Sequence, residues 1–95
     1  MTIAVLRITL RLPSRTLKEK RTIVKSVVER LRSRFNASVA EIEDLDTVSI
    51  ATIGAAVVSN SSQHADRQAQ SIAAAVESWR LDAEVIDVSV ERIEA

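Results

Sequence analysis

The 95-residue chain contains no cysteine, which excludes disulfides, thiolate metal ligands and a cysteine nucleophile. It contains one histidine, His64, so clustered imidazole ligands are excluded as well. With Gly54 as its one glycine, it has no glycine-rich loop that cradles a phosphate. We therefore expect no resident metal, no cofactor, no catalytic residues and no enzymatic activity.

Aromatic side chains and long apolar runs are also scarce. Phe35 and Trp79 are the aromatic residues, and both fall on the apolar stripes of expected helices, so RNA bases are not expected to stack on them. No apolar run approaches the roughly 18 residues of a membrane span. Residues 1–10 lack a basic leader and include Arg7, so we expect no signal peptide, no membrane partner and a cytoplasmic location.

The composition that remains, with 46% hydrophobic residues, is typical of a globular chain, and the length predicts a single domain over residues 1–95. The charges cancel overall but are unevenly distributed. Residues 7–34 hold ten basic and two acidic side chains, whereas the remainder holds three basic and eleven acidic ones. This asymmetry predicts an anionic partner for the basic segment. The alternative is that the two parts neutralise each other across the fold.

The first two elements are the most clearly marked. Residues 2–12 alternate with a period of two, which predicts a strand that Pro13 ends. Thr16 and Glu19 form a capping box for a helix within residues 14–36. The apolar strand face is Ala4, Leu6, Ile8, Leu10 and Leu12, and the apolar helix stripe is Leu17, Val24, Val27, Val28, Leu31 and Phe35.

The remaining elements follow from similar signals. Residues 37–43 and 48–58 predict two strands, and Gly54 predicts a bulge or a close approach by another backbone. Residues 62–80 predict a second helix, and residues 83–93 predict a last strand. The third strand is expected to turn Ile53, Ala55 and Val57 to the core, and the second helix to begin with a capping box of Asn60 and Gln63.

The element order β-α-β-β-α-β predicts an α+β, ferredoxin-like sandwich. Two helices would cover one face of a four-stranded antiparallel sheet with strand order 4-1-3-2, because each element then buries its apolar side. The first and last strands become neighbours in this order. We therefore expect Arg7 and Arg11 to pair across strands with Asp87 and Glu91.

The sheet face away from the helices is predicted to be unusually apolar. Its expected residues are Ile3, Val5, Thr9, Thr52, Gly54, Ala56, Val58, Val85 and Ile93. Contiguous exposed apolar patches usually mark interfaces, so this face predicts a homodimer or another protein partner. The alternative is that the face assignment of the third strand is inverted.

The basic helix predicts contacts with RNA phosphates. Its candidate residues are Arg15, Lys18, Lys20, Arg21, Lys25, Arg30, Arg32 and Arg34, arranged in two rows beside a line of small residues, Thr22, Ser26 and Ser33. An ordinary solvated helix would show similar residues. The acidic turn offers a second alternative, because Glu43, Asp44 and Asp46 would quench the site by pairing with Arg15 and Lys18.

The sequence supports an enzymatic function less well than a binding function. Acylphosphatases share the expected fold and hold phosphate in the loop after the first strand, but residues 12–16 contain no glycine to form such a cradle. His64 lies near Ser61 and Ser62, and polar residues at a helix start explain this cluster more simply than a catalytic triad does.

Four blocks of the sequence resemble the YlxP-like family of small bacterial proteins, a domain of unknown function. They are Thr-Leu-Lys-Glu-Lys-Arg (16–21), residues 30–41, residues 53–60 and Val-Ile-Asp (85–87). The resemblance implies a ferredoxin-like fold. Genes of the family often lie beside those for a ribosome-binding factor and a translation initiation factor, which implies ribosome assembly or RNA binding. The chain departs from the family pattern at Val48, Ile50 and Ser61.

Together these observations predict a binding module. The expected partner is RNA or the ribosome, bound through the basic helix. The alternative is a protein-interaction or dimeric scaffold that uses the open sheet face.

Overall fold

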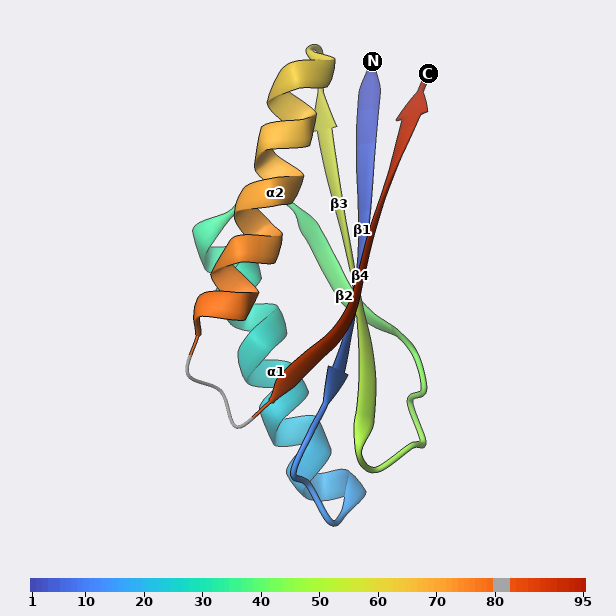
Figure 1. Cartoon of the computed structure of the whole chain (residues 1–95), viewed down its shortest axis with the longest axis vertical. Helices are drawn as coiled ribbons and strands as arrows, with labels where there is room; N and C mark the ends of the chain where they lie inside the picture. The colour runs from blue at the N-terminus through green and yellow to red at the C-terminus, as the bar shows by residue number, and fades with distance from the viewer. Residues whose placement is uncertain (80–82) are drawn as a thin grey trace.

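The computed structural model describes residues 1–79 and 83–95. The elements are β1 (Thr2–Arg11), α1 (Leu17–Arg34), β2 (Ser38–Glu43), β3 (Ile50–Ser59), α2 (Ser62–Ser78) and β4 (Glu84–Glu94). The strands form one antiparallel sheet in the order β2-β3-β1-β4, and both helices lie on one side of it (Figure 1). The predicted α+β, ferredoxin-like βαββαβ fold with strand order 4-1-3-2 is confirmed. The predicted end of the second helix, residue 80, lies outside the described residues.

The core lies between the sheet and the two helices, where the alternation of the strands meets the apolar stripes. The predicted core sides of β1 and β3 are both buried, so the face assignment of β3 is confirmed. The core residues from these elements are Ala4, Leu6, Ile8, Leu10, Ala51, Ile53, Ala55, Val57, Val24, Val27, Val28, Leu31, Ala65, Ala69, Ile72 and Val76. Their burial supplies the main driving force for folding, because it removes apolar surface from water.

The two helices begin at different kinds of cap. The Glu19 backbone N–H donates to Thr16 Oγ1 at 3.1 Å, so Thr16 is the predicted cap. Glu19 Oε2 accepts from the backbone N–H of Arg15 at 2.8 Å, one residue before the cap, so the second bond of the predicted capping box is displaced. The prediction of Asn60 as the cap of α2 is wrong. The cap is Ser61, whose Oγ accepts from the His64 backbone N–H at 3.3 Å. The helix itself begins at Ser62, as predicted, so only the capping residue is shifted by one position.

Gly54 marks a close approach, as predicted, but the approaching group is a side chain. An irregularity between Glu41 and Glu43 shifts the register of β2 against β3. Ile42 lies over Gly54, and a Cβ atom at Gly54 would stand 2.9 Å from Ile42 Cγ2. The prediction of an approaching backbone is therefore wrong, and the bulge belongs to the neighbouring strand.

The end of β4 is tied to β1 and α2 by hydrogen bonds to one carboxylate. Thr2 Oγ1 donates to Glu94 Oε2 at 2.8 Å, and Ser62 Oγ donates to Glu94 Oε1 at 3.2 Å. The hydrogen bond from Thr2 is the largest cause that lowers the pKa of Glu94 below its ordinary value, and it outweighs desolvation, which raises the pKa.

Candidate nucleic-acid interface

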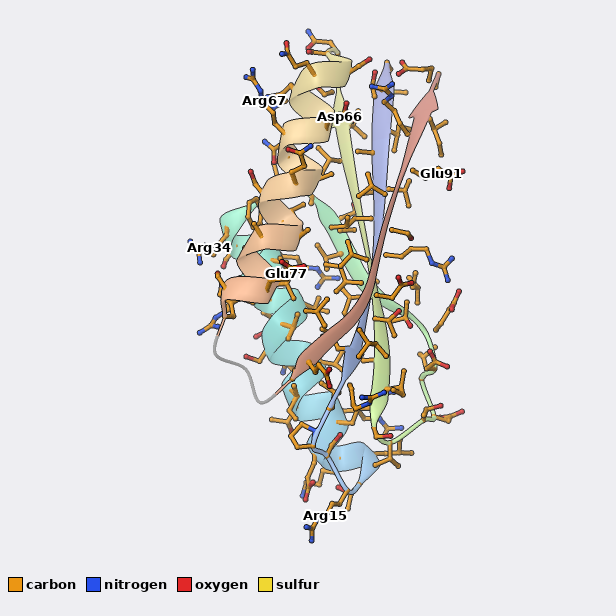
Figure 2. The ribbon with its side chains drawn as sticks, in the orientation of Figure 1. Arg15, Arg34, Asp66, Arg67, Glu77 and Glu91 are labelled. Atoms are coloured by element: carbon orange, nitrogen blue, oxygen red, sulfur yellow. The ribbon has the colours of Figure 1, made fainter. Side chains whose placement is uncertain are left out.

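The cationic side chains of α1 and the residue before its cap lie mostly at the surface. Seven of the eight candidate residues are exposed, namely Arg15, Lys18, Arg21, Lys25, Arg30, Arg32 and Arg34. Residues three or four positions apart share one side of a helix, so Lys18, Arg21 and Lys25 line one flank. Figure 2 shows Arg15 and Arg34 projecting outward near opposite ends of α1. We call these seven residues the α1 cationic surface.

A shallow hollow runs along the outer side of α1. It is lined by Thr22, Lys25, Ser26, Glu29, Arg30 and Ser33. The small side chains form the floor and two cations form the sides, as the sequence predicted. Such a surface lets a phosphate backbone approach the helix closely, although the carboxylate of Glu29 opposes an anion at one point.

Few carboxylates neutralise the α1 cationic surface. Lys25 Nζ is 4.0 Å from Glu29 Oε1, and both side chains are more than half exposed, so this pair holds Lys25 weakly. Among residues 1–79 and 83–95, no carboxylate oxygen lies within 4.0 Å of a side-chain nitrogen of Arg15, Lys18 or Arg21. These three exposed cations therefore form no ion pair with the described residues.

Two arginines of the surface have contacts with uncharged groups. Arg32 Nη2 donates to the Val39 carbonyl oxygen at 2.6 Å, which links the end of α1 to β2. The Arg30 guanidinium lies 5.0 Å from the centre of the Trp79 ring, a cation–π distance. Both contacts hold the guanidinium in place and leave its positive charge available.

The described contacts of the acidic turn after β2 do not neutralise the α1 cationic surface. Glu43 pairs with Arg7. The Asp44 carboxylate accepts a hydrogen bond from Thr52 Oγ1 at 3.1 Å. The expected alternative, in which this turn pairs with Arg15 and Lys18, is absent from the contacts among the described residues.

Lys20 is the exception among the candidate residues, and its prediction as a surface contact is wrong. The side chain is 1% exposed, its Nζ lies 3.1 Å from Glu41 Oε2, and it donates to the Asp44 carbonyl oxygen. The sequence carried a signal for this burial. Lys20 stands three residues after Leu17 and four before Val24, so it lies on the apolar stripe of α1. The methylene groups of its side chain are therefore buried with that stripe.

The cross-strand partners of the β1 arginines also differ from those predicted. Arg7 pairs with Glu43 of β2, and Arg11 Nη1 lies 3.3 Å from Glu84 Oε2. Asp87 is opposite Thr9, and Glu91 is opposite Val5, so neither lies directly across from an arginine. A register shift after Thr9 then brings Glu84 rather than Val85 opposite Arg11 at the end of β1.

The open sheet face keeps most of its predicted apolar residues. Ile3, Val5, Thr9, Gly54 and Ala56 are partly exposed, and Val58 and Ile93 are 61% and 43% exposed. Two residues are corrected. The register shift in β4 places Val85 opposite Leu10, on the helix side, where it packs against the core. Thr52 is on the predicted face but is 3% exposed, because the turn at Asp44 covers it.

A polar pocket that sequence reasoning missed lies where the end of α1 meets α2. It is lined by Arg34, Phe35, Asn36, His64, Arg67, Gln68 and Ser71. The signal was a polar stripe with helical spacing, since the four α2 residues stand at i, i+3, i+4 and i+7. Gln68 Nε2 lies 3.3 Å from His64 Nε2. Figure 2 shows Arg34 and Arg67 projecting away from the sheet, so this pocket extends the cationic surface onto α2.

Within residues 1–79 and 83–95, no three His, Asp or Glu side chains gather as metal ligands. In the same residues, no helix has the length and apolar character needed to cross a membrane.

Comparisons with known proteins find relatives by sequence and one likeness of fold. Residues 3–90 match the model of a family described as "Protein of unknown function (DUF503)". A similar protein is the uncharacterised protein YlxP of Bacillus subtilis, 34% identical over 64 residues, which are 67% of this chain and 70% of that protein. A similar solved structure is the de novo designed protein Foldit4, with 14% identity, 98% coverage of both chains and a TM-score of 0.53, a likeness of fold alone.

Proposed function

This chain belongs to the YlxP-like DUF503 family, and we propose that it is a binding module that associates with RNA, including RNA of the ribosome, through α1. The observation that carries the proposal is the set of exposed cations along one helix, most of which have no carboxylate partner among the described residues. A protein of zero net charge that gathers its cations on one side is suited to an anionic surface.

The proposed contact is made with phosphates rather than with base edges. The lysines and arginines of α1 lie beside small polar side chains, so the phosphate backbone can come close to the helix axis. Each phosphate that a lysine or arginine neutralises releases condensed counterions, which is the main source of affinity in such contacts. The pocket lined by Arg34 and Arg67 would provide one further phosphate contact beside the α1 cationic surface.

Recognition in this proposal depends on charge and shape. Phe35 and Trp79 both pack against the core, and the open sheet face presents aliphatic rather than aromatic side chains. Proteins that recognise single-stranded RNA by sequence stack the bases on exposed aromatic side chains, and the described surface presents no such set. We propose binding without catalysis and with little preference for RNA sequence.

The test is a salt titration of binding to a mixed-sequence RNA oligonucleotide, followed by fluorescence anisotropy. With four phosphate contacts, the slope of log affinity against log salt is expected to be about −3 to −4. Raising the salt from about 50 to about 200 mM should then weaken binding on the order of 100-fold. Co-sedimentation with ribosomes at low and high salt should show the same loss. No binding at low salt, or an affinity that is unchanged by salt, contradicts the proposal.

A further inference from the structure

The outer side of α1 presents hydrogen-bond acceptors as well as cations. The hollow there is lined by the carboxylate of Glu29 and by the hydroxyls of Thr22, Ser26 and Ser33. All four side chains are exposed, and at 3.6 residues per turn they fall within roughly 60° of one another around the helix axis. We call these four residues the acceptor line. A site for phosphates alone would not include a carboxylate at its centre, because like charges repel.

Two hydroxyls of the acceptor line already donate their protons to the helix itself. Thr22 Oγ1 donates to the Lys18 carbonyl oxygen at 3.1 Å, and Ser33 Oγ donates to the Arg30 carbonyl oxygen at 3.0 Å. A hydroxyl has one proton and two lone pairs, so each of these oxygens is left to accept a hydrogen bond from a ligand. Phosphate oxygens are acceptors too. The acceptor line therefore suits a ligand that donates hydrogen bonds.

The cations of α1 lie on both flanks of the acceptor line. Lys18, Arg21, Lys25 and Arg32 are on one flank, and Arg30 and Arg34 are on the other. The ion pair between Lys25 Nζ and Glu29 Oε1 is 4.0 Å long and exposed, so both groups can exchange it for contacts with a ligand. The ligand that fits this pattern has hydrogen-bond donors along its middle and anionic groups on each side.

We propose that α1 binds across the minor groove of an RNA duplex, with ribose 2′-hydroxyls on the acceptor line and phosphates of the two strands on the cationic flanks. This inference rests on the proposed function and specifies its ligand. The minor groove of A-form RNA is wide and shallow and displays the 2′-hydroxyls, whereas the major groove is too deep and narrow for side chains to read. A duplex also places one phosphate backbone on each side of these hydroxyls, which a single strand does not.

Glu29 has a specific role in this arrangement. Its carboxylate accepts a hydrogen bond from a 2′-hydroxyl, and a bond to a charged acceptor is stronger than one between neutral groups. DNA has no 2′-hydroxyl, so a DNA duplex would leave the carboxylate without a partner and close to phosphates. The acceptor line should therefore distinguish RNA from DNA, which phosphate contacts of the cations alone do not.

The test compares RNA, DNA and 2′-fluoro RNA duplexes of one sequence by fluorescence anisotropy. The 2′-fluoro duplex keeps the A form but has no 2′-hydroxyl proton to donate. The natural chain is expected to bind the RNA duplex at least about tenfold more tightly than either of the others, because they lack the hydrogen bonds to the acceptor line. A single strand of the same RNA should bind more weakly than the duplex.

The variant Glu29→Met tests the acceptor line directly, since it removes an acceptor together with a negative charge. It is expected to reduce the preference for the RNA duplex over the DNA duplex about fivefold. If Glu29 only repelled phosphates, the variant would bind both duplexes more tightly by the same factor. The matched control is Glu91→Met, which removes the same charge from β4, on the side of the sheet away from α1 (Figure 2), and should leave the preference unchanged. Circular dichroism shows that each variant is folded.

The outcomes separate this inference from the proposed function. Salt-sensitive binding with equal affinity for the RNA and 2′-fluoro duplexes overturns the inference and leaves RNA binding through α1 in place. So does tighter binding of the single strand, or a preference for RNA that Glu29→Met does not change. Absence of binding to any of these RNAs at low salt contradicts the proposed function itself, and this inference with it.

Discussion

Replacing Lys20 with methionine is expected to lower the free energy of unfolding by about 3–5 kcal/mol, because it leaves a largely buried carboxylate without its partner charge. The Lys20 side chain is 1% exposed and that of Glu41 is 16% exposed. Methionine fills a similar volume, so the loss is electrostatic rather than a cavity. The Asp44 carbonyl oxygen also loses the hydrogen bond that Lys20 donates to it.

The size of this effect follows from how β2 is attached to the fold. Among the six residues of β2, Val39 is the one that is fully buried, so the strand contributes little apolar surface to the core. The Lys20–Glu41 pair is therefore a main link between α1 and this edge of the sheet. Since small domains have a total stability of about 5–15 kcal/mol, the variant should be close to unfolding at room temperature.

Urea denaturation provides the measurement, with two companion variants. Lys18→Met removes an exposed lysine two positions away and should change stability by no more than about 0.5 kcal/mol. The double variant Lys20→Met with Glu41→Leu should recover most of the loss, because an apolar pair of similar volume can replace a buried ion pair. A Lys20→Met variant within about 1 kcal/mol of the natural chain would show that the pair contributes little.

The second large effect concerns RNA binding. Replacing Lys18, Arg21 and Lys25 with glutamine is expected to weaken RNA affinity on the order of 100-fold at about 0.1 M salt. The same change should reduce the steepness of the salt dependence by about 2–3 units, since each phosphate contact contributes about 0.7–0.9. Stability should change little, because all three side chains are exposed.

A matched control removes the same amount of charge elsewhere. Arg7, Arg11 and Arg92 have side chains that are 47%, 60% and 48% exposed, and each pairs with a carboxylate away from α1. Their triple glutamine variant has the same net charge as the α1 variant and should keep most of the affinity. Equal losses in the two variants would mean that RNA responds to overall charge and that α1 is not the contact surface.

Local patterns along the chain were sufficient to predict the fold. The period of two in β1 decided which residues face the core, and the capping box of Thr16 and Glu19 decided where α1 begins. Both signals arise from backbone geometry within a few residues, so they can be read without knowing what lies nearby. The strand order then followed, because one arrangement lets every element bury its apolar side.

The candidate site was predictable in part, for the same reason. Exposure of Lys18, Arg21 and Lys25 follows from their place on a flank of the helix outside the apolar stripe. Lys20 differs because the burial of its ammonium group depends on Glu41, a residue of β2 that supplies the opposite charge inside the protein. The helix pattern places Lys20 on the apolar stripe, but it cannot show that a carboxylate of another strand lies there to pair with it.

The amino-acid sequence by itself determined the element order, the two faces of the sheet and the concentration of cations on α1, because hydrophobic periodicity and charge spacing act locally. Only the tertiary structure decided that Lys20 pairs with Glu41, that Val85 turns to the core and that Arg7 pairs with Glu43. These outcomes depend on register shifts and on charges brought together from distant parts of the chain. Such contacts form only when the strands and helices have packed.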